Sequence, residues 1–189
     1  MWLPLKIPRR LMRKVSSSLL FLVLVAAVSF AQGGDKKAPL SPPGTASHSF
    51  ADGKKVTIDY SRPAARGRKI VGELVPYGKV WRTGANSATS LTTDTDLVIG
   101  GTAVPAGKYT LYTLPGETAW KLIINKQTGQ WGTQYDEKQD LARVDMQVGK
   151  TMAPVEQFTI SFDKGGADSA KLKLEWESTS ATVEVKEKK

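Results

Sequence analysis

The sequence predicts an all-β fold, either an antiparallel β-sandwich of jelly-roll type or a partly open barrel, with two long ordered loops. Short stretches of alternating apolar and polar residues recur along the chain, as they do in sandwiches and barrels. Glycine and proline turns separate these stretches, and none shows a 3.6-residue helical period. Two aperiodic stretches, residues 61–86 and 126–140, interrupt the pattern and are too aromatic to be disordered.

The N-terminal end of the chain has the features of a secretory signal peptide spanning residues 1–31. Residues 1–14 carry five basic and no acidic side chains, and residues 15–30 form an apolar run before a cut after Ala31. The densest part of that run, residues 19–30, is shorter than the roughly 20 apolar residues that a membrane span needs. We therefore expect a periplasmic or secreted protein, with a retained membrane anchor as the alternative.

The chain beyond the leader has the size of one domain with a sizeable core. Residues 32–46 are rich in Gly, Pro and Lys, which predicts a flexible tether. Residues 47–186 predict a single β domain, and residues 187–189 form a charged C-terminal end that would protect a last edge strand.

The composition excludes several classes of function. The chain has 27 basic and 18 acidic residues, but five of the basic ones lie in the leader, so the net charge falls from +9 to +4 without it. This mild charge argues against a nucleic-acid partner. Without cysteine the chain forms no disulfide and carries no lipid anchor, and its single histidine predicts no metal site or cofactor, although a carboxylate-rich site stays open. Membrane contact is expected only through the leader before cleavage, and the oligomeric state is left open.

Residues 48–60 predict the first hairpin. A three-residue loop at residues 51–53 places Phe50 on the same face as Val56 and Ile58, whereas a two-residue turn would place it opposite them. A short helix is possible within residues 136–142. The remaining strands are predicted at residues 88–93, 97–99, 108–114, 119–125, 141–148, 157–163, 170–177 and 181–185, the last of them as an edge strand.

Four arginines lie close together in the first aperiodic stretch: Arg62, Arg66, Arg68 and Arg82. Guanidinium groups present a planar fork of donors that suits carboxylate, phosphate or sulfate, so Arg62, Arg66 and Arg82 are candidates for binding an anion. Asn86 would orient the ligand through its amide, or would instead bond its own backbone in an Asx turn. The alternative for the arginines is exposure to water or an ion pair with an internal acid, the candidates being Asp59, Glu73, Asp140 and Asp145.

Aromatic side chains of the two aperiodic stretches are candidates for the walls of a site. They would stack against a sugar or a cation, or they would instead cap the open end of the core. Trp120 and Trp176 lie in alternating strands and are assigned to the core. The candidates for ligand contact are Tyr77, Trp81, Trp131 and Tyr135.

Signals for catalysis are few. His48 or Asp140 would be the base of a hydrolase, with Arg82 stabilising developing negative charge. No serine lies in a G-x-S-x-G elbow, and His48 falls beside the core face of its strand, so a structural role is the alternative for it. The chain has no phosphate-binding glycine motif either.

One long motif resembles a known family. Residues 62–89 (RPAARGRKIVGELVPYGKVWRTGANSAT) resemble the signature of a family of exported bacterial proteins catalogued as domain of unknown function 2911. The resemblance continues through residues 106–116, 119–126 and 131–144. It implies an all-β periplasmic or secreted domain without an established reaction, in which the two aperiodic stretches belong to one pattern. It supplies no catalytic residues.

Three hypotheses about function follow from the sequence. The first is a β-sandwich that binds a small anionic or sugar-like ligand between the two aperiodic stretches. The second is the periplasmic hydrolase just described. The third is a structural protein of the cell envelope without a small ligand, in which the same stretches hold the sandwich shut.

Overall fold

A computed structural model describes residues 40–189; the predicted signal peptide and residues 32–39 of the predicted tether lie outside this range. No helix in the described range is long and apolar enough to cross a membrane. Residues 40–189 consist of strands and loops apart from one 3-10 helix, η1 (Glu137–Gln139). The strands are β1 (Pro43–Ser49), β2 (Lys55–Ser61), β3 (Thr89–Thr93), β4 (Leu97–Ile99), β5 (Thr102–Val104), β6 (Gly107–Pro115), β7 (Trp120–Asn125), β8 (Asp140–Lys164) and β9 (Ser169–Glu187).

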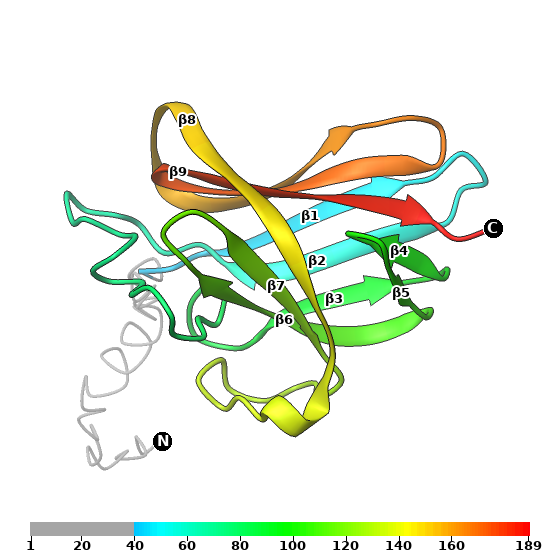
Figure 1. Cartoon of the computed structure of the whole chain (residues 1–189), viewed down its shortest axis with the longest axis horizontal. Helices are drawn as coiled ribbons and strands as arrows, with labels where there is room; N and C mark the ends of the chain where they lie inside the picture. Colours follow the sequence, from blue (N-terminus) through cyan, green and yellow to red (C-terminus); the bar gives the residue numbers. More distant parts are fainter. Residues whose placement is uncertain (1–39) are drawn as a thin grey trace, which may run out of the picture. The chain divides into compact units, whose positions relative to one another are not determined.

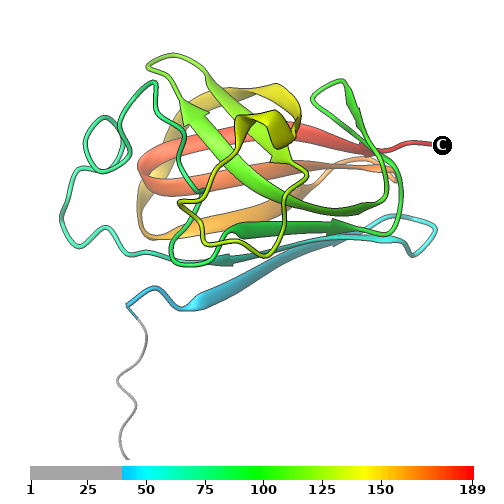
Figure 2. The same cartoon turned by 90° about the horizontal axis from the view of Figure 1, so that it is seen from below.

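The strands pair antiparallel in the order β1-β2-β3-β6-β7-β8-β9-β4-β5. β8 belongs to two layers, because its first residues pair with β7 while residues 147–164 pair with β9. Figure 1 shows β8 crossing obliquely from one layer to the other, and Figure 2 shows the layers from below. The sheet ends at β1 and β5 and is not closed into a barrel, so the prediction of an all-β sandwich or partly open barrel is confirmed.

Tyr60 spans the gap between β2 and β8. Its hydroxyl accepts a hydrogen bond from the backbone N–H of Ile160 at 2.8 Å and donates to the carbonyl of the same residue at 3.3 Å. The ring also packs edge-on against Phe158. A side chain thus satisfies backbone groups that would otherwise remain unpaired at the edge of β8.

The first hairpin has the predicted three-residue loop. The backbone N–H of Phe50 bonds to the carbonyl of Lys54 at 2.9 Å, and Gly53 is left-handed with φ 87°. Phe50, Val56 and Ile58 accordingly share the buried face, as predicted from the alternation of the sequence.

Several boundaries differ from the predictions. β1 begins at Pro43, so the last four residues of the predicted tether belong to the first strand. β5 was not predicted, and the predicted helix is reduced to the single turn η1. The end of β9 is not an edge, since residues 185–187 pair with β4. Glu187, expected in the charged C-terminal end, is in this strand and accepts a hydrogen bond from Thr95 Oγ1 at 3.0 Å.

β9 is continuous where the sequence predicted two strands, because it contains a bulge. Even-numbered residues from Ala170 to Trp176 face the core, whereas odd-numbered ones do so from Ala181 to Val185. Glu177, with φ 53°, lies where the register shifts. One extra residue moves the following side chains to the opposite face, so a bulge breaks the alternation without ending the strand.

Candidate functional site

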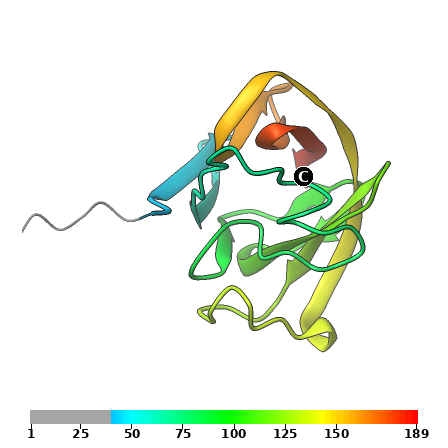
Figure 3. The same ribbon diagram turned by 90° about the vertical axis from the view of Figure 1, so that its left-hand side faces the viewer.

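A cavity of about 640 Å³ lies at the end of the domain that carries the long connection between β2 and β3. We call this connection, residues 62–88, the first loop, and residues 126–136, between β7 and η1, the second loop. Figure 3 faces this end, where the first loop crosses the opening between the layers. Both loops contribute to the lining, together with Trp176 of β9 and with Leu40 and Ser41, which precede β1.

The first loop is ordered because it buries apolar side chains and forms hydrogen bonds to β8 and β9. Ala65, Ile70 and Val75 are almost fully buried and belong to the hydrophobic core. Two acidic side chains hold the backbone of the loop. Glu156 of β8 accepts a hydrogen bond from the N–H of Arg66 at 2.8 Å, and Glu177 of β9 accepts one from the N–H of Ile70 at 2.9 Å. The aperiodic stretch is therefore an ordered loop, as its composition predicts.

A strained turn at residues 82–86 positions Arg82 beside the cavity. Thr83 has φ 51°, which is rare for a β-branched residue and energetically unfavourable. Hydrogen bonds impose this conformation, since Thr89 Oγ1 donates to the Thr83 carbonyl at 2.7 Å and the Thr83 and Thr113 hydroxyls lie 3.2 Å apart. Strain held by surrounding structure is typical of functional sites.

The second loop is held by a polar network around Asp140. The carboxylate accepts from the Tyr135 hydroxyl at 2.6 Å, from Arg143 Nε at 2.9 Å and from Asn125 Nδ2 at 2.8 Å. Arg143 also pairs with Glu137 at 2.8 Å. Burial, followed by the hydrogen bond to Asp140, raises the pKa of Tyr135 from 10.0 to about 12, so the phenol is neutral at physiological pH. Every polar group of this network has a partner inside the protein.

The two loops touch where Arg82 and Asn86 meet Gly132. The N–H of Gly132 donates to the Asn86 carbonyl at 3.0 Å. A Cβ atom at position 132 would lie 2.8 Å from both Arg82 Cδ and the Asn86 carbonyl oxygen, so glycine allows the close approach. The sequence prediction did not single out Gly132, because nothing in its local sequence shows which distant loop it meets.

Four cationic side chains line the cavity, and no carboxylate does. They are Arg66, Arg68, Lys79 and Arg82, and none of them forms an ion pair with any residue of the described part. The acids proposed as their partners bind other groups: Glu73, Asp140 and Asp145 pair with Lys69, Arg143 and Lys121, and Asp59 accepts from Thr45.

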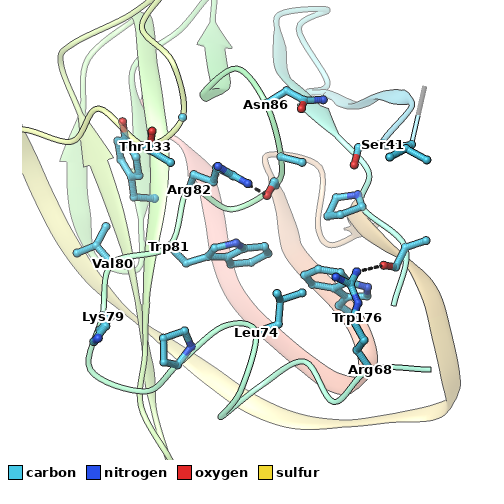
Figure 4. Close-up of a pocket in the computed structure, with 18 of the residues that line it drawn as sticks. Ser41, Arg68, Leu74, Lys79, Val80, Trp81, Arg82, Asn86, Thr133 and Trp176 are labelled. Atoms are coloured by element: carbon cyan, nitrogen blue, oxygen red, sulfur yellow. Dashed lines mark hydrogen bonds between the residues drawn. The ribbon is translucent and has the colours of Figure 1, made fainter. Parts of the chain in front are cut away.

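Arg68 and Arg82 differ in how many N–H donors remain free for a ligand. Arg68 uses Nε and one terminal nitrogen on the carbonyls of Ala65 and Ala64, which braces the first loop. Arg82 bonds only through Nε, at 3.4 Å from the Gly84 carbonyl, which leaves its terminal N–H groups available (Figure 4). Of these two arginines, Arg82 therefore keeps more N–H donors free for a ligand.

Two stacked indoles, those of Trp81 and Trp176, lie between Arg82 and Arg68 in Figure 4. Trp81 and Trp176 stack with ring centroids 5.7 Å apart and planes 19° apart, and Phe158 packs edge-on against Trp81 at 4.9 Å. Trp176 is only 5 % exposed, and one face of Trp81 is covered by it. The pair is an apolar surface beside the cations more than an open platform for a sugar ring.

Five of the eight predicted ligand-contact residues line the cavity: Arg66, Trp81, Arg82, Asn86 and Tyr135. Arg62 does not, because its guanidinium bonds to the Phe158 carbonyl and to Thr159 Oγ1 across the β2–β8 gap. Tyr77 and Trp131 are exposed neighbours of lining residues. The exposed Asn86 makes no side-chain hydrogen bond within residues 40–189, and its left-handed φ of 59° suits asparagine.

Several lining residues were missed by the sequence analysis. Trp176 was assigned to the core from its alternating strand; it is buried and also borders the cavity. Lys79 lies between Gly78 and Trp81 in the most specific part of the motif, and that position was its only signal. Leu74 and Thr133 carry no signal of their own in the sequence.

The residues proposed as a hydrolytic base do not line the cavity. His48 packs against Phe50 and Phe162, with ring centroids at 5.0 and 6.1 Å, and its Nε2 is buried without a partner in the described structure. Asp140 serves the network of the second loop. Within residues 40–189 no three His, Asp or Glu side chains gather as metal ligands would.

Comparison with known proteins identifies the family. Residues 41–185 match the model of the family described as protein of unknown function (DUF2911). The chain belongs to this family. The match covers every strand from β1 to β8 and most of β9, and it includes both loops that line the cavity. No curated protein and no solved structure matches the chain.

Proposed function

We propose that this DUF2911 protein binds a small anion in the cavity between its two loops. The observation that carries the proposal is the lining: four cations without ion-pair partners in the described part, and no carboxylate. Arg82 is only partly exposed in this concave, partly apolar site, so an anion paired with it gains more than it would on an open surface, while Arg66, Arg68 and Lys79 are exposed.

Arg82 is the principal anion-binding residue in this proposal. The strained turn fixes its backbone, Gly132 lies against its side chain, and its terminal nitrogens are free. Asn86, four residues along the same turn, would add an amide donor, and Arg66 and Lys79 would add longer-range attraction. A carboxylate or phosphate would accept two parallel hydrogen bonds from the guanidinium.

The apolar wall favours a ligand with an uncharged body beside its anionic group. Leu74, Val80 and the edge of the Trp81–Trp176 pair form this wall. A carboxylated sugar and an organic acid both have an uncharged body and an anionic group, whereas a neutral sugar lacks the anionic group. The hydrolase hypothesis lacks a base in the lining, so binding is the activity that the geometry supports best.

Calorimetric titration with citrate, glucuronate, inorganic phosphate and neutral glucose tests the proposal. We expect at least one anion to bind saturably and glucose not to bind. Arg82→Ala should weaken that binding about tenfold or more, since a hydrogen bond to a charged group contributes about 1.5–3 kcal/mol. The melting temperature should stay nearly unchanged.

Lys108→Ala is the matched control, because Lys108 is exposed, has no ion pair in the described part and does not line the cavity. It should leave affinity unchanged. The proposal fails if no anion binds saturably, if both variants lose affinity equally, or if Arg82→Ala unfolds the protein.

A further inference from the structure

The positive charge of the domain is concentrated in one segment. Residues 61–86 contain six basic residues and one acidic residue, Glu73. The rest of the chain beyond the predicted leader has 16 basic and 17 acidic residues. The first loop thus accounts for the whole net positive charge, and the remaining surface is close to neutral.

Exposed apolar side chains gather in the same region. We call four of them the apolar rim: Leu40, Leu74, Tyr77 and Trp131, which are 65 %, 46 %, 43 % and 52 % exposed. Leu40 and Leu74 line the cavity, Tyr77 follows the lining residue Pro76, and Trp131 precedes the lining residue Gly132. The only other large exposed apolar residue in the described part is Met152, on β8.

A small ligand does not account for the whole rim. Tyr77 and Trp131 lie outside the lining of the cavity, so a molecule enclosed there would leave both in water. Exposed leucine, tyrosine and tryptophan around a cationic segment need a partner that is apolar inside and anionic at its surface. Leucine is poorly suited to stacking on nucleic-acid bases, for which aromatic and arginine side chains are used.

We propose that this end of the domain docks on the surface of an anionic lipid bilayer. The basic residues of the first loop would meet the lipid headgroups, each contributing up to about fivefold in binding. The rim would enter the interface, where tryptophan and tyrosine are enriched and leucine buries apolar area.

Two acidic residues beside the first loop are engaged by its backbone. Glu156 and Glu177 accept hydrogen bonds from backbone N–H groups of the loop itself. Glu73 is exposed and lies 3.7 Å from Lys69, which offsets its charge locally. With six basic residues and one acidic residue in residues 61–86, the first loop keeps a net positive charge.

Co-sedimentation with vesicles tests this docking, using a chain that begins at Gln32 so that the apolar leader is absent. Residues 38–189 form a compact unit that contains all the strands, so this chain retains the whole fold. The probes are vesicles of phosphatidylcholine alone and of phosphatidylcholine with about one-third phosphatidylglycerol. We expect binding to the anionic vesicles only, weakened by added NaCl because salt screens charge.

Tyr77→Ser and Trp131→Ser should each reduce vesicle binding roughly tenfold, since each removes a large apolar side chain from the interface. Met152→Ser, which removes an exposed apolar side chain outside the rim, should leave it unchanged. Brominated acyl chains should quench tryptophan fluorescence, and Trp131→Phe should reduce that quenching, since Trp120 and Trp176 are buried and Trp81 is half-buried.

Equal binding to neutral and to anionic vesicles would overturn docking by charge. Vesicle binding that is unaffected by the Tyr77 and Trp131 substitutions would overturn insertion of the rim. Binding to single-stranded DNA in place of vesicles would overturn the choice of partner. Because Tyr77 and Trp131 do not line the cavity, both variants should keep the affinity for soluble anions. Failure of vesicle docking is thereby distinguishable from failure of anion binding by Arg82.

Discussion

Both loops contain glycine, tryptophan and tyrosine, but they use their polar side chains in opposite ways. In the second loop, Tyr135 bonds to Asp140 and Arg143, which bond to one another, so the charges satisfy each other inside the protein. In the first loop, the cationic groups at the cavity have no acidic partner in the described part, as Arg82 illustrates. A polar group without a partner at a concave site indicates function, whereas a closed network indicates support.

This difference predicts which substitutions affect stability and which affect binding. Removing a member of the closed network leaves other polar groups unsatisfied, and this is costly when they are shielded from water. Removing an unpaired cation from the lining of the cavity leaves no other polar group without a partner. Three substitutions test the contrast, in order of decreasing effect.

The largest effect is expected for Asp140→Ala. The variant loses the acceptor of three hydrogen bonds at a side chain that is only 11 % exposed, and Arg143 keeps Glu137 but loses one of its two anionic partners. We expect the free energy of unfolding to fall by about 2–4 kcal/mol, measured by urea denaturation at pH 7.

Asp145→Ala is the control, because Asp145 also pairs with a cation, Lys121, but its side chain is 80 % exposed. Exposed pairs contribute at most about 1 kcal/mol. If both variants lost the same stability, the network of the second loop would not have the supporting role that the comparison assigns to it.

Tyr135→Phe should have a smaller, pH-dependent effect. The variant loses the hydroxyl that links Asp140 and Arg143, which should lower the free energy of unfolding by about 1 kcal/mol at pH 7. Burial raises the pKa of Tyr135 above its ordinary value to about 12, so the folded state favours the neutral phenol. That stabilisation is complete below about pH 10 and is lost as pH rises through about 12.

The difference in stability between wild type and Tyr135→Phe should therefore be constant up to about pH 10 and shrink above it. Urea denaturation of both proteins across this range measures it, and taking the difference removes the contribution of the lysines. A difference that grows with pH would mean that the folded state favours the phenolate, contrary to the geometry of the network.

The sequence was sufficient to predict most strands and to single out five residues that line the cavity. Alternation identified the buried faces of β2 and of the first part of β9, because a residue's face in a strand depends only on local order. It failed at Glu177, where a bulge changes the phase, and at β5, where Val104 is the one buried residue.

The candidate site was predictable to the extent that it depends on one continuous segment. Trp81, Arg82 and Asn86 were found because they lie within six residues in an unusual loop. Arg62 has the same local features, yet its guanidinium meets Phe158 and Thr159, which the sequence does not place near it. Which arginine is free and which is engaged is decided by contacts almost a hundred residues apart.

The smallest effect is expected for Lys79→Ala, which tests the first loop without touching its hydrogen bonds. Lys79 is exposed and lines the cavity, so it acts on an anion mainly through long-range attraction. Its removal should weaken binding of the anion found by titration about threefold at low salt, with no effect in about 0.5 M NaCl, because screening shortens the range of the interaction. The stability should not change.

Lys138→Ala makes the same change of charge next to the second loop, where Lys138 is exposed in η1 and does not line the cavity. Its removal should leave anion binding unaltered at either salt concentration. Equal effects of the two lysines would mean that the anion responds to the net charge of the domain. An effect of Lys79 alone would localise the attraction to the cavity and assign it to the first loop.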